Sequence, residues 1–352
     1  MPKKQTPKRT KAAPVRVLFT CVGRRVELIR AFERAGDELG VDLEIHGADA
    51  SRLTPAMQLV EQPHVVPAIA SGQYVDALTD IVRRRNIGLL VPLLDSELLL
   101  IAEARDRFAA LGCRAMISTS AVIETCQDKL ATFRALQNAG IDTPQTWSFV
   151  IVAEARRQQF PYYLKPRRGS AAKGNYIIRD ADELMVLGKR VPGAIVQEYV
   201  EGEEYTLDVY TGLDGVARCV VPRKRLEVRT GEVSKGLVVK NPEIMAVGER
   251  VAKMLGECRG VITVQCIVTP QGRIRVIEIN ARFGGGVPLA IHAGADFPKW
   301  ILQEHLGRRP RIHATGFRDG VAMLRFDESV FVNGAMRLLS KTIAGATKRK
   351  NT

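Results

Sequence analysis

The apolar positions of residues 15–117 fall into short continuous runs separated by stretches with helical spacing. The first run, VRVLFT (15–20), is closed by a turn at Gly23, and apolar positions then recur with the spacing of one helical face up to Gly36. Further apolar runs, which predict strands, lie at residues 43–49, 64–69 and 87–94, and residues 74–85 again have helical spacing. Strands alternating with helices are typical of a parallel sheet covered by helices. We therefore predict a parallel α/β domain over residues 15–117.

Charged residues follow several of these predicted strands. Parallel sheets bind ligands at the carboxyl ends of their strands, so Arg24, Asp49, Asp95 and Glu97 are candidates to face such a crevice. The alternative is that they cap helices or lie in solvated loops. Only Gly23 stands where a dinucleotide fingerprint would need three glycines, so no nicotinamide or flavin cofactor is expected in this domain.

Beyond residue 118 the pattern changes to runs separated by turns. Residues 128–136 predict a helix that ends near Gly140, and the runs 161–166 and 175–179 flank a glycine-containing loop at 167–174. Later runs that predict strands lie at residues 194–200, 203–211, 217–226, 261–269 and 273–280. Consecutive strands joined by turns pair in the antiparallel sense, so we predict an α+β region after the parallel domain.

The composition is that of a globular protein, and much of the positive charge lies at the termini. With 352 residues, 46% hydrophobic and 26% charged, the chain is neither wholly disordered, nor collagen, nor a disulfide miniprotein. The net charge is +14, of which residues 1–14 carry +5 and residues 348–350 carry +3. We predict disordered basic tails at 1–14 and 336–352. With 6% aromatic residues and no interleaving of basic and aromatic positions, nucleic acid is not expected as the main ligand.

Cysteine and histidine spacings give no sign of a metal or disulfide framework. The six cysteines include no C-x-x-C pair and the five histidines no H-x-x-x-H pair, so we interpret the cysteines as reduced core residues. The apolar run 87–94 is too short to cross a bilayer, and no signal peptide opens the sequence. A cytoplasmic protein without a membrane partner is expected.

Lys165 ends an apolar strand immediately before the 167–174 loop. An ammonium group held beside the backbone N–H groups of a flexible loop suits phosphate oxygens. Further residues of this loop with freedom or donors to contribute are Gly169, Ser170, Lys173 and Gly174. The alternative is an ordinary hairpin loop. It is not a Walker A loop, because no Lys-Ser/Thr pair follows the second glycine.

Two later segments carry clusters of polar residues. In residues 197–208 (QEYVEGEEYTLD), several acids follow an apolar strand. Backbone groups at the strand end can recognise a purine edge, and a carboxylate can accept hydrogen bonds from ribose hydroxyls. The alternative is a solvated acidic turn. Glu278 and Asn280 lie two apart on a predicted strand, so their side chains leave the same face, and Arg282 follows. A hairpin through the turn at 269–272 would place Gln265 beside Glu278. Oxygen ligands of this kind suit Mg²⁺, completed by phosphate oxygens and water.

In combination these segments resemble the ATP-grasp superfamily, most closely short-form relatives of the carbamoyl phosphate synthetase large subunit. The motifs that carry the resemblance are DKLATFRALQNAGIDTP, YYLKPRRGSAAKGN, VQEYVEGEEYTLDVY and VIEINARFGGG. The resemblance implies a parallel α/β pre-grasp domain (15–117), followed by an ATP-grasp fold of two α+β subdomains. These would be a small subdomain with the phosphate loop (118–190) and a central subdomain with the metal site (191–335).

The resemblance also implies roles for individual residues. Lys129 and Lys165 would contact the ATP phosphates, beneath the 167–174 loop. Gln197 and the backbone of Glu198 and Val200 would hold adenine, and Glu204 would hold the ribose. The ligands of one or two Mg²⁺ ions, or of Mn²⁺, would be Gln265, Glu278 and Asn280. Arg282 would act on the transferring phosphate, and Arg225 matches a basic position near the acyl-phosphate site.

The activity implied is that of an ADP-forming ligase that activates a carboxylate as an acyl phosphate for attack by an amine. Nothing matches a second synthetase repeat or a glutaminase, so carbamoyl phosphate synthesis itself is not expected. The alternatives are a phosphotransferase that releases a phosphorylated product and a nucleotide-binding module without turnover. An amino acid or small peptide is the expected substrate, a homodimer is possible in such enzymes, and Arg24, Asp49, Asp95, Glu97, Arg225 and His292 are substrate-site candidates.

Overall fold

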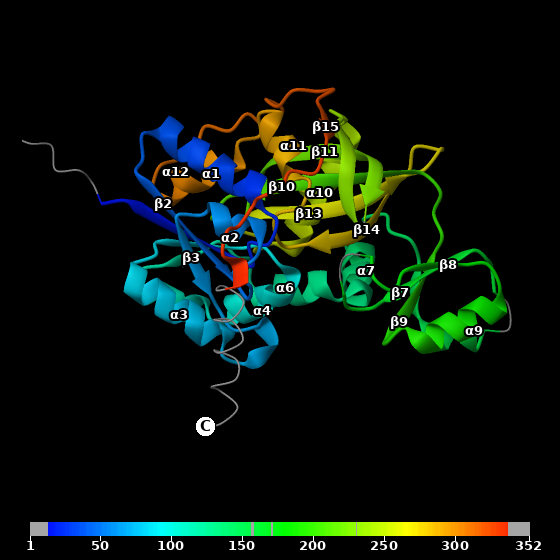
Figure 1. Ribbon diagram of the computed structural model, residues 1–352. Helices are drawn as coiled ribbons and strands as arrows, with labels where there is room; N and C mark the ends of the chain where they lie inside the picture. Colours follow the sequence, from blue (N-terminus) through cyan, green and yellow to red (C-terminus); the bar gives the residue numbers. More distant parts are fainter. Residues whose placement is uncertain (1–12, 156–157, 170–171, 230, 337–352) are drawn as a thin grey trace, which may run out of the picture.

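The computed structural model describes residues 13–155, 158–169, 172–229 and 231–336. The expected tails, residues 1–14 and 336–352, and the loop residue Ser170 therefore lie wholly or almost wholly outside the described residues. The described residues form three sheets: a parallel sheet in the N-terminal domain, a large antiparallel sheet and a small antiparallel sheet (Figure 1).

The N-terminal domain is the predicted parallel α/β unit. Its sheet has the strand order β3-β2-β1-β4-β5, and its neighbouring strands run parallel. Its elements are β1 (Val15–Thr20), α1 (Val26–Leu39), β2 (Leu43–Asp49), α2 (Pro55–Leu59), β3 (Gln62–Val65), a 3₁₀ turn (Ile69–Ser71), α3 (Tyr74–Arg85), β4 (Leu89–Pro92), α4 (Asp95–Glu103), α5 (Arg105–Ala109) and β5 (Arg114–Ala115). Two helices, α6 (Ser120–Gln127) and α7 (Lys129–Asn138), then lead out of the domain and pack on each other.

The large antiparallel sheet, here the central sheet, has the order β14-β13-β10-β11-β12-β15. Its elements are β10 (Glu203–Thr211), β11 (Ala217–Arg229), β12 (Glu232–Val238), α10 (Pro242–Leu255), β13 (Gly260–Val268), β14 (Ile274–Asn280), α11 (Val287–His292), α12 (Phe297–His305) and β15 (Ala322–Leu324). One face of the sheet is apolar and is covered by α10, where Gly248 lets the helix approach Leu207 and Val220 closely. The opposite face is therefore the one left to carry polar side chains.

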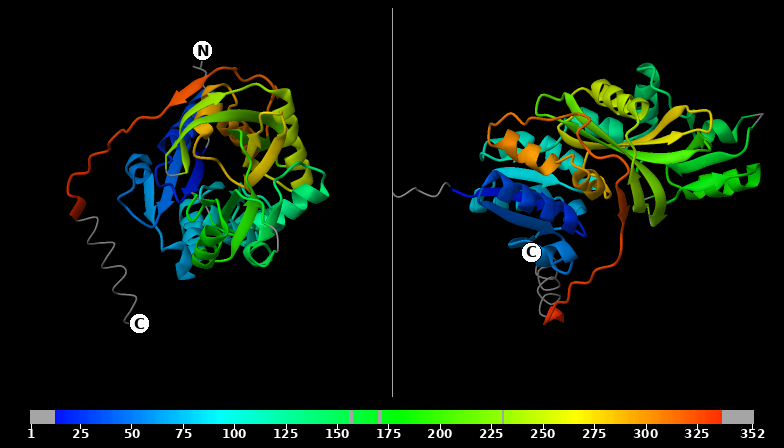
Figure 2. Two further views of the ribbon diagram at one scale, coloured as in Figure 1. Left: turned by 90° about the vertical axis from the view of Figure 1, so that its right-hand side faces the viewer. Right: turned by 90° about the horizontal axis from the view of Figure 1, so that it is seen from above.

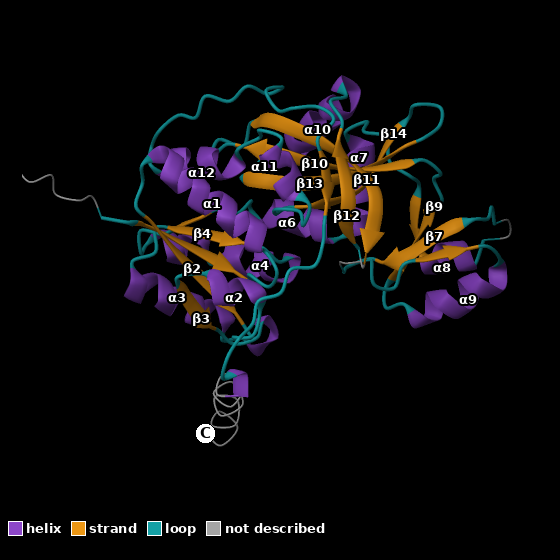
Figure 3. Ribbon diagram, turned by 45° about the horizontal axis from the view of Figure 1, so that its top comes forward, coloured by secondary structure: helices purple, strands orange, loops and turns teal. Residues whose placement is uncertain are grey.

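The small antiparallel sheet, here the small sheet, has the order β6-β9-β7-β8 and carries two helices (Figure 3). Its elements are β6 (Thr146–Ser148), α8 (Phe149–Ala153), β7 (Tyr162–Pro166), β8 (Tyr176–Ile178), α9 (Ala181–Arg190) and β9 (Ala194–Glu198). Because β9 completes this sheet, the unit extends to Glu198, beyond the end expected at residue 190. It has an apolar cluster of its own, separate from the core shared by the N-terminal domain and the central sheet.

Two predicted strands of the N-terminal domain are displaced or shortened. The strand expected at 64–69 is β3, which ends at Val65 because its partner β2 ends opposite it, at Asp49. The strand expected at 87–94 ends at Pro92, since the backbone N–H groups of Leu93 and Leu94 each donate to Glu97 Oε1 at 3.0 Å. Glu97 is fully buried and caps the start of α4. Of the two alternatives given for it above, a ligand-facing group or a helix cap, it is therefore the helix cap.

The chain after β14 returns to the N-terminal domain. Helices α11 and α12 pack against α1, and β15 then adds to the edge of the central sheet at β12. Beyond β15 the chain leaves the sheet and runs back along the N-terminal domain (Figure 2), where Glu328 lies 3.7 Å from Arg30 of α1. The segments that follow β14 and β15, the two edge strands of the central sheet, therefore both contact the N-terminal domain.

Candidate active site

The polar face of the central sheet is built by cross-strand register. One row runs across four strands through Glu278, Gln265, Thr206 and Arg223, and each residue is paired with the next. The next row contains Asn280, Thr263 and Asp208. Because paired residues of adjacent strands point to the same side, these side chains share one face. The register confirms that Gln265 lies beside Glu278.

This face forms the floor of a cavity of about 490 Å³. Its other walls come from β7 and β9 of the small sheet, from the turn after β14, and from the N-terminal domain through Arg25, Leu94 and Asp95. The two antiparallel sheets and the N-terminal domain thus contribute to one cavity. The predicted site residues that line it are Lys165, Gln197, Glu198, Val200, Glu204, Arg225, Gln265, Glu278, Asn280 and Arg282.

Lys165 is a buried cation of the cavity, with 3% of its surface exposed. Its Nζ donates to Gln197 Oε1 at 3.0 Å and to the Ile277 carbonyl at 3.3 Å, so it joins the small sheet to β14. Burial lowers the pKa of its ammonium group to about 8, while the nearby Glu278 carboxylate acts in the opposite direction. A buried ammonium group without a carboxylate bonded to it is suited to an anionic ligand.

Lys129 lies at the first position of α7, next to the start of the predicted phosphate loop. Its backbone N–H donates to the Arg167 carbonyl at 3.1 Å and its Nζ donates to the Gly169 carbonyl at 2.8 Å. Asp128 caps α7 and also accepts from Arg167 Nε at 2.8 and 2.9 Å, which ties the loop to the helix. Lys129 and Gly169 line a smaller neighbouring cavity of about 210 Å³, rather than the larger one.

The remaining loop residues contribute less to the cavities than expected. Lys173 is exposed, and neither it nor Gly174 lines either cavity. Gly174 instead has φ of 75° and lies close to the Pro166 ring, where a side chain would be strained. The loop side of the larger cavity is formed by Ala172 and Asn175.

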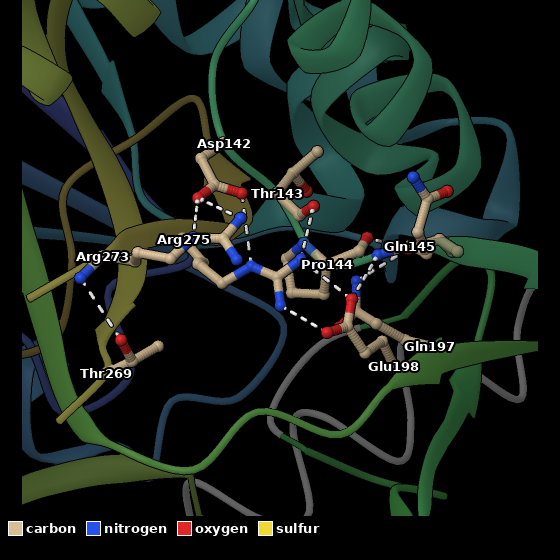
Figure 4. A network of polar contacts seen from close by, with 10 residues as sticks. Asp142, Thr143, Pro144, Gln145, Gln197, Glu198, Thr269, Arg273 and Arg275 are labelled. Carbon is tan, nitrogen blue, oxygen red and sulfur yellow. Dashed lines mark hydrogen bonds and ion pairs between the residues drawn. The ribbon is translucent and has the colours of Figure 1, made fainter. Parts of the chain in front are cut away.

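Glu198 is committed to an ion-pair network that connects the small sheet with β14 (Figure 4). Arg275 donates through both terminal nitrogens to the two Glu198 oxygens, at 2.6 and 2.8 Å, and through Nε to Asp142 at 3.2 Å. The Glu198 carboxylate also accepts from the Gln145 backbone N–H at 3.2 Å. Arg275 lowers the pKa of Glu198. Because Arg275 holds the Glu198 carboxylate, Glu198 can contact a ligand through its backbone, as can the neighbouring Tyr199 and Val200. Sequence reasoning missed Arg275.

Glu204 and Arg225 face each other across β10 and β11. Arg225 Nε lies 3.1 Å from Glu204 Oε1, and its other nitrogens approach Thr206 Oγ1 at 3.4 Å and the Gly231 carbonyl at 3.3 Å. Burial raises the pKa of Glu204, and the Arg225 charge opposes that effect. The two residues therefore form one partly neutralised pair.

The oxygen-ligand set lies at the β13–β14 edge. Asn280 Nδ2 donates to Glu278 Oε1 at 3.4 Å, and Gln265 is the register partner of Glu278. One carboxylate and two amide groups thus converge, a donor set that fits Mg²⁺ when phosphate oxygens and water complete the shell. Among the described residues no group of three or more His, Cys, Asp or Glu side chains is placed to hold a metal ion.

Arg282 makes the contact between the metal edge and the N-terminal domain. Its Nε donates to Asp95 Oδ2 at 2.9 Å, its Nη2 donates to the same oxygen, and its Nη1 donates to the Phe283 carbonyl at 3.0 Å. Asp95 is the first residue of α4 and lines both cavities, as do Glu278 and Asn280. Of the charged residues expected at the strand ends, Asp95 is therefore the one that enters the site.

The other substrate-site candidates lie elsewhere. Asp49 accepts from the Gly23 and Ser51 backbone N–H groups at 3.0 Å each, and so holds a turn. Arg24 is 77% exposed, and neither Arg24 nor His292 lines either of the two cavities described above. The residues of the cavity that sequence reasoning missed include Arg25, Tyr163, Arg223, Glu232 and Thr263. At Thr263 the sequence signal was a polar residue inside an otherwise apolar strand.

Family comparisons divide the chain at the same place as the structure. Residues 126–286 match the ATP-grasp domain family, and residues 17–117 match the PylC-like N-terminal domain family. The chain thus carries an ATP-grasp domain behind a PylC-like N-terminal domain.

Among curated proteins, the chain is similar to the 3-methyl-D-ornithine–L-lysine ligase of Methanosarcina acetivorans, at 31% identity over 47% of this chain and 42% of the relative. It is also similar to the D-alanine–D-alanine ligase of Aquifex aeolicus, at 25% identity over 49% of this chain and 66% of the relative. The chain spans less than two thirds of the length of these curated relatives in each match.

Solved structures share the fold. The L-amino acid ligase from Bacillus licheniformis superposes with a TM-score of 0.66 at 20% identity, covering 83% of this chain and 74% of that one. The biotin carboxylase domain of the Hydrogenobacter thermophilus 2-oxoglutarate carboxylase, solved with MgADP and bicarbonate, gives 0.70 at 16% identity, covering 87% and 73%. Within the described residues, no helix is both long and apolar enough to span a bilayer.

Proposed function

We propose that this ATP-grasp protein is an ATP- and magnesium-dependent ligase that joins a carboxylate to an amine and releases ADP and phosphate. The observation that carries the proposal is the convergence of Lys165, the Gln265–Glu278–Asn280 set and Arg282 on one cavity, between the two antiparallel sheets and the N-terminal domain. A cation, an oxygen-ligand set and an arginine in one enclosed space are what phosphoryl transfer needs, since that chemistry depends on positioning and charge neutralisation.

ATP would lie between the small sheet and the central sheet. Adenine would contact Gln197 and the backbone of residues 198–200, and the ribose would lie near Glu204. Lys165 would hold the phosphates from the inner side, while Lys129 and the loop beginning at Gly169 would hold them from the smaller cavity. The buried position of Lys165 supports this, because an ammonium group with two neutral partners is stabilised by a phosphate anion.

Magnesium would be held by Glu278, Asn280 and Gln265 together with phosphate oxygens, where it would neutralise the charge of the transferring group. In the reaction, a substrate carboxylate oxygen would attack the γ-phosphorus, the bond to ADP would break, and an acyl phosphate would form. An amine nitrogen would then attack the acyl carbon, inorganic phosphate would leave, and the amine would lose a proton. Arg282, beside Asn280, would stabilise the negative oxygens of both steps.

The carboxylate and amine substrates would be amino acids or small peptides. The similarity to ligases whose names specify 3-methyl-D-ornithine, L-lysine and D-alanine supports this proposal. Such substrates and their ATP would be met in the cytoplasm, and a homodimer is the assembly we propose.

An ADP-release assay with pooled amino acids tests the proposal. The ligase predicts ADP release that requires both a carboxylate and an amine substrate, with the amide product detected by mass spectrometry. ADP release with a carboxylate alone and a stable phosphorylated product would instead identify a phosphotransferase. Nucleotide binding without ADP release from any pool would contradict both enzymes and indicate a binding module.

A further inference from the structure

Arg223 is a buried arginine with one guanidinium nitrogen that has no partner. It is 1% exposed, and it donates to Asp208 through Nε at 2.5 Å and through Nη2 at 3.0 Å. Its third nitrogen, Nη1, is also buried but has no hydrogen-bond partner among the described residues. Because Asp208 holds the other two nitrogens, the orientation of the guanidinium plane is defined, and Nη1 is the nitrogen left without a partner.

The free nitrogen abuts the turn of three glycines that follows Arg282. A Cβ atom built on Gly286 would lie 2.3 Å from Arg223 Nη1, and one built on Gly284 would lie 3.5 Å from Nη2. At the glycine between them, a Cβ atom would lie 2.8 Å from Arg25 Nη1. The glycines thus give room for two guanidinium groups, one from the central sheet and one from the N-terminal domain. Both arginines and all three glycines line the larger cavity.

This end of the cavity is positively charged and distinct from the metal edge. Glu232 is shared by Arg24 and Arg25, each at 3.7 Å, and by Arg325 at 3.2 Å, so three cations surround one carboxylate. The Arg223 and Asp208 charges cancel. Glu278 and Arg223 stand on strands three places apart, a separation of about 14 Å between their backbones.

We propose that Arg223 and Arg25 bind a substrate carboxylate that does not react and that remains in the product. The inference rests on the proposed ligase function, in which the reacting carboxylate lies at the metal edge near Arg282. A second anionic group of the substrates then meets the positively charged end. There the unpaired Arg223 Nη1, which carries two N–H groups, and the Arg25 guanidinium suit a carboxylate. Asp208 is a positioning residue that orients Arg223. The substrate class is therefore one whose amide product keeps a free carboxylate.

Binding of product-like dipeptides tests this without requiring turnover, because a dipeptide carries the retained carboxylate but not the reacting one. The full-length protein in the presence of MgADP is titrated by calorimetry with a panel of dipeptides and with their C-terminal amides. The variants are Arg223→Lys, which keeps a cation beside Asp208, and Arg25→Gln. Arg25→Gln does not leave Glu232 unpaired, because Arg24 and Arg325 still pair with it. Arg24→Gln is the matched control, because Arg24 shares Glu232 but lies outside the cavity.

Amidation should raise the Kd of the best dipeptides by about 10- to 100-fold, the effect of losing one or two charge-assisted contacts. Arg223→Lys and Arg25→Gln should each raise the Kd for the free dipeptide by a similar factor, to a value close to the Kd for the amide. Neither variant should change ADP binding. The control Arg24→Gln should bind the dipeptide as wild type does. Equal binding of dipeptides and amides, no binding of any dipeptide, or variants that keep the full preference would overturn the subsite. Carboxylate-dependent binding without ADP release in the ligase assay would contradict the proposed function alone, whereas ADP release without that preference would contradict the subsite alone.

Discussion

Arg282 and Asp95 connect the proposed reaction centre with the N-terminal domain. The Arg282 guanidinium donates twice to one Asp95 oxygen, although the two residues are 187 positions apart in the sequence. Their side chains are 14% and 17% exposed, so water screens the pair only partly. The orientation of Arg282 therefore depends on how the N-terminal domain is placed.

Replacing Asp95 should disturb both stability and turnover. Asp95→Asn leaves the Arg282 guanidinium with a neutral acceptor, and we expect a loss of about 1–3 kcal/mol in the free energy of unfolding. Turnover should fall, because Arg282 loses its orientation, while ATP binding should change little. Urea unfolding and steady-state kinetics provide the measurements. Asp76→Asn, which breaks the exposed pair with Arg107, is the control and should be nearly neutral.

Lys165→Met should weaken nucleotide binding. One lost charge-assisted phosphate contact is expected to cost about 1.5–3 kcal/mol of binding free energy. Stability should fall little, since the substitution also removes a buried ammonium group whose charge is costly to desolvate. Calorimetry with MgADP measures the effect, and the surface variant Lys189→Met is the control. Wild-type affinity in Lys165→Met would show that the phosphates lie elsewhere.

Nucleotide binding should also depend on the charge of Lys165. Its pKa is about 8 in the folded protein and 10.5 ordinarily, so its charged form is lost as pH rises through 8. Affinity for ATP should decrease above pH 8, and binding at pH 8.5 should take up protons, measurable as a dependence of the calorimetric heat on the buffer.

The lowered pKa of Lys165 also makes the stability of the protein depend on pH. Between pH 8 and 10.5 the unfolded chain holds more protons on this lysine than the folded protein does, so this group makes the free energy of unfolding rise with pH. Relative to Lys165→Met, the wild type should therefore gain stability over that window. A constant difference between the two proteins would contradict the lowered pKa.

Magnesium should bind strongly only with nucleotide. Glu278 is the one formal negative charge among the three proposed protein ligands, and Mg²⁺ sheds water reluctantly. Glu278→Gln should lower turnover far more than it lowers stability, and a chelator should abolish activity without unfolding the protein. Tight Mg²⁺ binding in the absence of nucleotide, measured by calorimetry, is the result that this assignment does not allow.

The Arg275 network should control the position of the small sheet. Arg275→Met removes the double contact with Glu198 and should cost about 1–3 kcal/mol of stability. It should also raise the KM for ATP, because β9 carries the proposed adenine contacts. Arg273→Met is a matched control: Arg273 pairs with the same Asp142 but is 62% exposed. Equal effects of the two variants would mean that the Glu198 contact does not position the sheet.

Local sequence determined a large part of the fold. The strands β1, β2 and β10 and the helix α3 lie where their patterns predicted them, because the alternation of apolar runs and helical spacing is a property of neighbouring residues. The metal edge was predictable for the same reason: two residues apart on a strand share a face, and one tight turn at 269–272 determines the partner of Glu278.

Only the tertiary structure decided the rest of the site. Arg223 is paired with Thr206 and bonded to Asp208 through the register of β10 and β11, whereas Arg25 and Asp95 reach the cavity because the N-terminal domain packs on the turn after β14. The short strand β15 likewise forms because a distant segment meets the edge of β12. Such contacts depend on strand register and domain packing over tens to hundreds of residues, and local periodicity carries no information about either. The sequence thus determined which residues could do chemistry at the metal edge, and packing decided which cations share the cavity with them.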